Sequence, residues 1–437
     1  MRLKTTMLRF ACILAASLTF GAPVALAASQ VSQGGVTGAV RVDSVTQAVR
    51  LAVERSLSLQ AADAGRQASL GDQRQAGVMP NPELSIEAEN FAGSGAYRGT
   101  RSLETTFGIS QRLEIGGKRG ARADAAQASV TLAELDYAAA RLDLVRDVTK
   151  AYSAAVAAER LVDIEKERLR LADEVLKAVR GRVDAGKEPL IQVRKAEVTR
   201  SAARIAQERA GREADAARRT LANLLNVGRV DLRPNHAWFE DLGAAPRAVF
   251  AGLDTKGNPD RARRDAQMAR SRAGLAAEQA AAIPDVTLRA GVRRFRESGD
   301  TAVVAGVAIP IPVFDRNQGA VVRARQELVR TEVEARKADL ELEAALAEAE
   351  LRLESSWQEA AALRREALPN ATEAFALANE GYRSGKFSFL EMLDAQRTLF
   401  DVRAQLNQAL HDAHSLRADI DRLSGAASLN SHNGDRP

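Results

Sequence analysis

Two acidic side chains in the C-terminal part of the sequence are the first candidates for chemistry. Glu391 and Asp394 lie three residues apart in a stretch with helical spacing, so their carboxylates share one helix face. Carboxylates gathered on one surface attract cations and repel anions. The solvated face of an ordinary helix has the same residue pattern, so both interpretations stay open at this point.

A second polar group, His411, Asp412 and His414, lies further along the same predicted helix. Histidines three residues apart can bind one metal ion, but no third or fourth ligand accompanies them, and we predict no metal site. The sequence also lacks the G-x-S-x-G, P-loop and dinucleotide-binding motifs. We therefore expect no enzyme activity and no cofactor.

The helix that carries these residues belongs to a segment, 380–424, that occurs twice in the chain. Gly186 precedes Gly385 by 199 positions, and the residues around the two glycines align at this offset. After each glycine, apolar residues recur three and four positions apart, as in a helix wound against other helices. The sequence therefore predicts two copies of one long helical hairpin.

Helical spacing extends well beyond the repeated segment. At 1.5 Å per residue, a helix of some sixty residues would span roughly 90 Å, far more than a compact domain needs. Besides 380–424, we predict helices over 42–75, 118–182, 190–225, 258–282 and 320–382.

Two segments with a period of two precede each predicted hairpin. The alternation covers 84–88 and 103–115 in the first half, and 286–292 and 303–313 in the second. Runs of about ten such residues suit tilted strands that cross a bilayer, although surface hairpins of soluble domains alternate in the same way. Four strands cannot close a barrel, so membrane strands would require several chains to share one.

The order of the elements divides the chain into five parts. We predict a signal peptide at 1–28, a first repeat at 42–225, a connector at 226–258, a second repeat at 259–424 and a disordered tail at 425–437. The first part has basic residues, an apolar run and a small-residue cleavage site. It also holds the single cysteine, so the exported chain would contain no disulfide and no thiolate metal site.

The charge of the chain does not indicate a nucleic-acid partner. The formal net charge is +5 and the pI is about 9.5, but basic and acidic residues are interleaved along the predicted helices. This mixture is typical of solvated helix faces. Together with the export signal, it excludes nucleic acid as an expected partner.

A strand pair followed by a long helical hairpin, twice over, resembles the TolC-like outer-membrane efflux channels across about 42–424. The motifs that carry the resemblance are MPNPELSIEAENF, SQRLEIGGKRG, IPDVTLRAGVRRF, AIPIPVFDRNQG and GYRSGKFSFLEMLDAQRTL. The first, second and fourth look most like the branch that serves heavy-metal cation (cobalt-zinc-cadmium) exporters. The implied fold is mainly α, with duplicated helical hairpins forming a periplasmic α-barrel. Four β-strands per chain would contribute to a shared trimeric outer-membrane β-barrel.

The resemblance implies the outer-membrane channel component of a tripartite efflux system in a Gram-negative cell. This homotrimer would sit in outer-membrane lipid and passively conduct heavy-metal cations to the outside. Its other partners would be a periplasmic adaptor (membrane fusion) protein and an inner-membrane resistance-nodulation-division pump. Two alternatives stay open: a channel for drug or organic efflux or type I protein secretion, and a soluble periplasmic coiled-coil adaptor.

Roles for individual residues follow from the same resemblance. Glu391 and Asp394 match acidic positions that line the pore constriction, and Tyr382 matches a residue that holds the gate closed. Gln192 departs from the family, because it stands where an acidic gate partner is expected. The tips of the hairpins would dock the adaptor, with Val183, Gly186, Lys187, Gly385 and Lys386. The strand-to-helix junctions would be Gly116, Gly117, Pro310 and Pro312.

Overall fold

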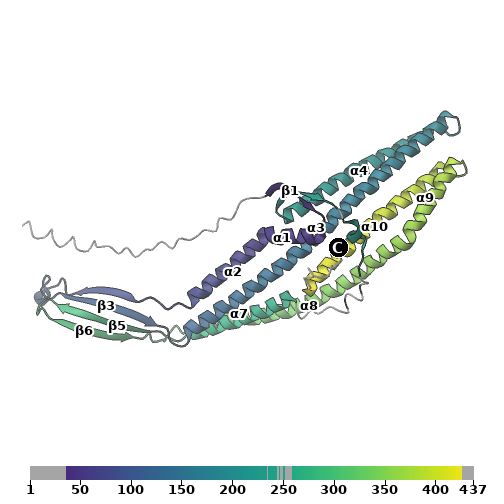
Figure 1. Ribbon diagram of the computed structural model, residues 1–437. Coiled ribbons are helices and arrows are strands. Elements are labelled where there is room, and N and C mark those ends of the chain that lie inside the picture. Colours follow the sequence, from purple (N-terminus) through teal and green to yellow (C-terminus); the bar gives the residue numbers. More distant parts are fainter. Residues whose placement is uncertain (1–35, 234, 244–245, 247–249, 251–257, 426–437) are drawn as a thin grey trace, which may run out of the picture. The chain divides into compact units, whose positions relative to one another are not determined.

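The structure is a computed structural model (Figure 1). It describes residues 36–425 except 234, 244–245, 247–249 and 251–257. The predicted signal peptide at 1–28 and the predicted tail beyond Gly425 therefore lie outside the described residues. The described residues from Val36 onward belong to one compact unit.

Long helices account for most of the fold. The longest is α3, whose 67 residues would extend roughly 100 Å at 1.5 Å per residue. In chain order the helices are α1 (Val45–Arg55), α2 (Leu57–Ala76), α3 (Lys118–Asp184), α4 (Leu190–Leu224), α5 (His236–Glu240), α7 (Pro259–Ala281), α8 (Gln318–Ala362), α9 (Leu368–Arg383) and α10 (Phe389–Ser424). Among the described residues, none of these helices has a stretch long and apolar enough to cross a membrane.

The prediction of one helix over 42–75 was wrong, because this segment contains two helices. Ser56 is both the C-cap of α1 and the N-cap of α2. Its Oγ accepts a hydrogen bond from the Leu59 N–H at 3.3 Å. A serine that bonds to the backbone in this way interrupts a helix and starts the next one. Val42 ends a strand instead of beginning a helix.

The second long helix is also interrupted where the sequence predicted continuity over 320–382. One turn of π-helix, Leu363–Ala367, separates α8 from α9. Pro369 follows in the first turn of α9. A proline inside a helix has no N–H to donate and clashes with the carbonyl four residues before it, and a widened turn accommodates it.

In the part of the chain that the structure describes, six strands form two sheets: β1 (Val36–Val42), β2 (Glu83–Glu89), β3 (Glu104–Leu113), β4 (Val227–Leu232), β5 (Val286–Phe295) and β6 (Thr301–Ala308). β1 and β4 make a parallel pair, with Val40 beside Val230. The sequence did not predict β1. The other four strands form an antiparallel sheet in the order β2-β3-β5-β6.

The register of the four-stranded sheet separates apolar from polar side chains. Ile86, Phe107, Val292 and Val303 are direct neighbours across the four strands. The next row, on the opposite face, contains Glu87, Thr106, Arg293 and Ala302. The apolar face is uncovered in this chain: Leu84 is 79% exposed and Val303 is 84% exposed.

The fourth strand is shorter than predicted, since β6 ends at Ala308 and not at residue 313. Pro310 and Pro312 lie directly after it. Proline has no N–H to continue a ladder of hydrogen bonds, so pairing stops before these residues.

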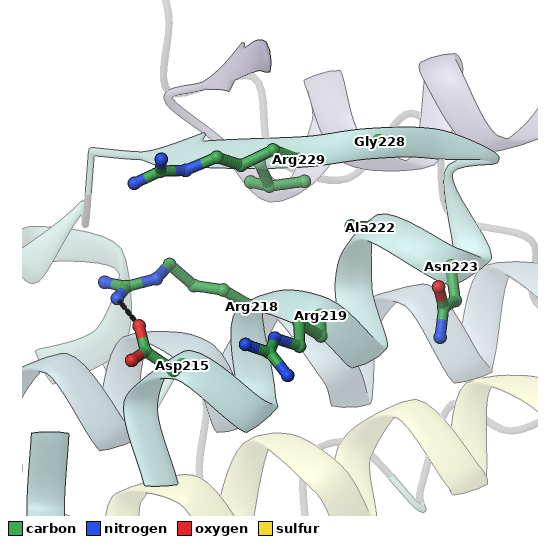
Figure 2. Close-up of a pocket in the computed structure, with 8 residues that line it drawn as sticks. Asp215, Arg218, Arg219, Ala222, Asn223, Gly228 and Arg229 are labelled. Atoms are coloured by element: carbon green, nitrogen blue, oxygen red, sulfur yellow. Dashed lines mark hydrogen bonds and ion pairs between the residues drawn. The ribbon is translucent and has the colours of Figure 1, made fainter. Parts of the chain in front are cut away.

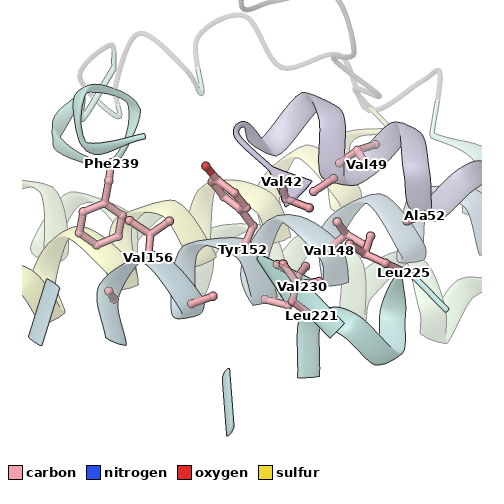
Figure 3. Packing of buried hydrophobic residues seen from close by; sticks show 14 of the residues in the cluster. Val42, Val49, Ala52, Val148, Tyr152, Val156, Leu221, Leu225, Val230 and Phe239 are labelled. Atoms are coloured by element: carbon pink, nitrogen blue, oxygen red, sulfur yellow. The ribbon is translucent and has the colours of Figure 1, made fainter. Parts of the chain in front are cut away.

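Five of the described helices form a continuous series of contacts: α4 packs on α3, α3 on α10, and α10 on both α8 and α9. The main buried cluster lies along this series and extends to the β1–β4 pair (Figure 3). It includes Tyr152 and Val148 of α3, Leu221 of α4, Val230 of β4 and Leu410 of α10. The duplicated hairpins are thereby held side by side around a common core.

Candidate functional site: the paired hairpin tips

The two hairpin tips have the same backbone. Each helix ends in a glycine with left-handed φ, Gly186 at 71° and Gly385 at 77°. The Lys187 N–H donates to the carbonyl of Arg182 at 2.9 Å, and the Lys386 N–H donates to the carbonyl of Gly381 at 2.8 Å. These are the bonds of a Schellman motif, which needs glycine because other residues are strained at this φ.

Charged groups of the first tip contact Tyr382 of the second. The Tyr382 hydroxyl donates to a Glu188 carboxylate oxygen at 3.4 Å, and an Arg182 Nη donates to the Tyr382 carbonyl at 3.0 Å. Arg182 and Glu188 form an ion pair at 2.8 Å, and the guanidinium lies 4.9 Å from the centre of the Tyr382 ring. We call Arg182, Glu188 and Tyr382 the tip clasp.

An apolar cluster supports the clasp. Tyr382 is only 2% exposed, and its ring lies 5.8 Å from that of Phe389. Burial, together with the nearby Glu188 carboxylate, raises the pKa of Tyr382 to about 12. The remaining buried members come from both hairpins: Val175, Leu176, Val179, Val193, Ala196, Ala378 and Met392.

Glu391 has a structural role that the sequence analysis missed. It is the third residue of α10, and its carboxylate accepts from the Ser388 N–H at 2.7 Å. The Ser388 Oγ accepts in return from the Glu391 N–H at 3.3 Å, which completes a capping box. The bond from the Ser388 backbone holds the pKa of Glu391 below its usual value. The S-x-x-E spacing was the signal that would have found it.

The other predicted constriction residues differ in their surroundings. Asp394 is exposed, and its side chain forms no hydrogen bond or ion pair with another described residue. Gln192 is half-buried, and its backbone N–H donates to the Pro189 carbonyl at 3.0 Å. The 199-residue offset places Gln192 opposite Glu391 and Lys195 opposite Asp394. Only the second tip therefore presents this pair of carboxylates.

The residues predicted to dock an adaptor lie at the ends of the hairpins, and their role stays a prediction. Gly186, Lys187, Gly385 and Lys386 are exposed. Val183 is half-buried and packs against the apolar cluster below the clasp. Four of the five predicted docking positions are therefore accessible at the ends of the hairpins, and Val183 is the exception.

The first strand-to-helix junction is tightly packed. Gly116 and Gly117 both have left-handed φ, 74° and 75°, between β3 and α3. A Cβ on Gly116 would lie 2.5 Å from the side chain of Ile283, whereas the space around Gly117 is open. Across the junction, Lys118 forms an ion pair with Asp285 at 2.6 Å.

In the second junction, the counterpart of Gly117 is Asn317. Both residues are N-caps of the long helices and both have left-handed φ, 58° for Asn317. The Asn317 amide donates to the Glu278 carbonyl at 2.8 Å. Pro310 and Pro312 lie before it, in the segment without regular secondary structure between β6 and α8. Asparagine tolerates this backbone better than most residues, which was the signal available in the sequence.

The histidines of α10 have separate partners. The His411 Nδ1 is 3.0 Å from the Ser153 Oγ, and the ring of His414 stacks on Trp238 at 4.2 Å. Burial lowers the pKa of His411. Among the described residues, no group of three or more His, Cys, Asp and Glu side chains could hold a metal ion.

Comparison with known proteins identifies the family. The sequence model of the outer membrane efflux protein family matches residues 48–227 and 255–426. The cobalt-zinc-cadmium resistance protein CzcC of Cupriavidus metallidurans is 30% identical over 378 residues, which cover 86% of this chain and 89% of CzcC. The nickel-cobalt-cadmium resistance protein NccC of Alcaligenes xylosoxydans is 29% identical over 295 residues, 68% of this chain and 66% of NccC.

A solved structure of CusC has the same fold, with a TM-score of 0.71 at 22% identity over 87% of this chain and 91% of CusC. The expected resemblance to TolC-like channels is thus confirmed. The family match covers well over half of the chain and the match to CzcC nearly all of it. The chain therefore belongs to the outer membrane efflux protein family and is an outer-membrane channel component of an efflux system.

Proposed function

We propose that three copies of this protein form a duct that passively conducts heavy-metal cations out of the cell. An inner-membrane pump of the resistance-nodulation-division type would supply the cations through a periplasmic adaptor docked on the hairpin tips. The observation that carries the proposal is the four-stranded sheet, because one of its faces is apolar and uncovered while the other is polar.

The apolar face suits lipid. Leu84 and Ile86 of β2, Phe107 of β3 and Val303 and Val307 of β6 are all more than half exposed in the single chain. A soluble protein rarely exposes a continuous apolar surface of this kind. Contact with acyl chains would remove these side chains from water, at roughly 25 cal/mol per Å² of apolar surface.

The edges of the sheet suit a shared barrel. β2 and β6 are the outer strands, and each pairs with a single neighbour. Unpaired backbone groups are costly in lipid, so each edge needs a partner strand. Three copies of the four-stranded sheet would supply twelve strands, which can close on themselves.

The polar face suits a water-filled interior. Arg293 of β5 forms ion pairs with Glu89 at 2.8 Å and with Glu104 at 3.0 Å. Small residues lie on the same face, among them Gly108 and Gly291, which are direct neighbours across β3 and β5. Charged side chains would be expensive in lipid but are stable where water reaches them.

Two observations support cations as the cargo. CzcC and NccC are both named for resistance to cobalt and cadmium. At the second tip, Glu391 and Asp394 are exposed, and three copies of this pair would form a ring of negative charge. Such a ring would favour cations, while the choice among metals would be made by the pump.

The proposal is tested by growth of a strain that lacks this gene on graded cobalt, zinc, cadmium and nickel. Parallel plates carry dyes, detergents and antibiotics. We expect sensitivity to metals, restored by the intact gene. Sensitivity to organic compounds alone would contradict the metal assignment and favour a drug-efflux channel. A mature chain that is soluble and monomeric, without heat-sensitive trimers in outer-membrane extracts, would contradict the duct itself.

A test of the predicted charge at the constriction requires a variant that removes the carboxylates and keeps the start of the helix intact. Glutamine at the third helical position can still complete a capping box, so Glu391→Gln with Asp394→Asn removes charge and keeps the cap. We expect lower metal tolerance at an unchanged level of trimer. The control is Glu373→Gln, which removes an exposed carboxylate from the preceding helix, α9. Equal tolerance in both variants would contradict a charged constriction.

A further inference from the structure

We propose that a basic groove between α4 and β4 binds an acidic stretch of α8 in a neighbouring copy of the chain. This inference rests on the proposed assembly of identical chains and assigns the residues that join them. The groove has a volume of about 350 Å³. Figure 2 shows three arginines around it, Arg218 and Arg219 from α4 and Arg229 from β4, together with Asn223.

The groove carries positive charge that the described acidic residues only partly neutralise. Arg218 forms ion pairs with Asp215 and Glu159. Arg219 and Arg229 are exposed, and neither has an acidic partner among the described residues. Two guanidinium groups are therefore available for carboxylates from outside the chain, and guanidinium binds carboxylate with two parallel hydrogen bonds.

The outer face of α4 continues from this groove toward the hairpin tip. Ile191, Val198 and Ile205 follow one another at seven-residue spacing and are 56%, 70% and 60% exposed. Arg212 and Arg219 continue the same row. Residues seven apart lie on one side of a helix, so this face is apolar near the tip and basic near β4.

The acidic stretch lies on α8, between residues 339 and 359. Arg352 is its single basic residue, and its acidic residues are Asp339, Glu341, Glu343, Glu348, Glu350, Glu354 and Glu359. Glu350 and Glu359 are exposed and have no cationic partner among the described residues. Leu351, between them, is 73% exposed. The stretch thus combines uncompensated negative charge with an uncovered apolar side chain.

The helix that carries the groove and the helix that carries the acidic stretch contribute to the same buried cluster. Leu221 and Ala222 of α4 belong to one buried cluster with Ala360 of α8. Between these helices lie α3 and α10, because α4 packs on α3, α3 on α10, and α10 on α8 (Figure 1). The basic and acidic surfaces therefore lie at the same level of the core, at the two ends of one series of helices.

This placement favours a head-to-tail contact between copies. The α4 end of one chain would meet the α8 end of the next, and such contacts form closed rings when the rotation closes. The open edges of the sheet would also meet head to tail, with β6 of one chain beside β2 of the next. Complementary charge contributes mainly to the choice of partner and the register of the contact, so the groove would align neighbouring helices.

Cysteine cross-linking tests the contact directly. The single cysteine is Cys12, in the predicted signal peptide, so introduced cysteines are the reactive ones. A chain with Arg219→Cys and Glu359→Cys should form covalent dimers and trimers on oxidation in outer-membrane preparations. In the matched control, Arg219→Cys is combined with Glu327→Cys, an exposed α8 residue near the opposite end of that helix. The control should stay unlinked.

Charge reversal tests the chemistry. Arg219→Glu with Arg229→Glu should abolish most of the heat-resistant trimer, and adding Glu350→Arg with Glu359→Arg should restore it. Since all four residues are exposed, each variant should keep the wild-type melting temperature of the helices.

Three outcomes would contradict the account in distinguishable ways. Normal trimers without the cross-link and without an effect of reversal would overturn the α4–α8 contact and leave the duct intact. A cross-link from residue 219 to a different protein would also overturn it, because the groove would then serve another partner. A wild-type chain that forms no trimer would instead overturn the proposed function.

Discussion

The two hairpin tips share one backbone and differ in what their side chains do. Both end in a left-handed glycine with the same pair of capping bonds. The first tip contributes charge, with Arg182 and Glu188. At the equivalent positions the second tip has Gly381 and Phe387, and a Cβ on Gly381 would lie 2.2 Å from the Phe387 ring. The two tips of the duplicated hairpin thus have the same backbone but complementary side chains.

The difference explains how one tip can hold the other. With their present side chains, Arg182 reaches both the ring and the carbonyl of Tyr382, and Glu188 accepts from its hydroxyl. We infer that the divergence of the two tips, within a conserved backbone, is what allows a clasp between them.

The largest expected effect comes from removing the aromatic centre of the clasp. Tyr382→Ala should lower the free energy of unfolding by about 3–5 kcal/mol, because it deletes a buried ring. Tyr382→Phe keeps the ring and should cost only about 0.5–1.5 kcal/mol for the lost hydrogen bond. Thermal unfolding in detergent measures both. Equal losses would show that the ring does not support the contact between the tips.

A pair of glycines should respond with opposite signs. Gly381→Ala would displace the Phe387 ring and should destabilise the protein by about 1–3 kcal/mol. Gly181, near the end of α3, has no atom within 4 Å of its Cβ position, so Gly181→Ala should stabilise the helix by about 1 kcal/mol. Chemical denaturation of the two variants provides the test. Unchanged or higher stability in Gly381→Ala would contradict the close packing of the Phe387 ring on Gly381.

The capping box gives a smaller effect that is confined to the second tip. Glu391→Ala should cost about 1 kcal/mol, because it removes the acceptor of the Ser388 N–H. Glu391→Gln should retain most of this stability. At the aligned position of the first tip, Gln192→Ala removes no cap and should change little. Hydrogen exchange at the first turns of α4 and α10 would detect the difference, and equal protection in Glu391→Ala and wild type would exclude the capping role.

The last prediction concerns pH, and at neutral pH it involves no change in stability, because Tyr382 is then protonated in both the folded and the unfolded chain. The pKa of Tyr382 rises from 10.0 to about 12 in the fold, so the folded protein retains this proton longer than the unfolded chain. The resulting stability is complete below pH 10 and is lost as pH rises toward 12. The free energy of unfolding, measured from pH 10 to pH 12, should fall more steeply in wild type than in Tyr382→Phe. Parallel curves would contradict a buried, neutral tyrosine at the clasp.

Periodicity made the duplicated helices and the four-stranded sheet predictable. A period of two located the strands near 84–88 and 286–292, and the 199-residue offset located both tips. β1 escaped because VTGAVRV has no clear pattern and pairs with β4, which lies far along the chain. The π-helical turn escaped because only Pro369, two residues beyond it, signals the interruption.

The site was only partly predictable for a similar reason. Tyr382 and Glu391 were singled out by motif, and the capping box around Glu391 could have been read from its spacing. The participation of Arg182 and Glu188 depends on the contact between two tips that lie about two hundred residues apart in sequence. Local patterns carry no information about such a contact, so their pairing with Tyr382 required the structure.

We propose that the clasp, which contains the expected gate residue Tyr382, also keeps the duct narrow at its tips. Conductance in planar lipid bilayers tests most directly whether this protein is a membrane duct and whether the clasp narrows it. The purified wild-type protein should insert and show a small, cation-selective conductance. A chain with Arg182→Ala and Glu188→Ala, which removes both charged groups of the clasp, should conduct markedly more with the same selectivity. Failure of both proteins to insert would contradict the duct, and equal conductance in the two would contradict closure by the clasp.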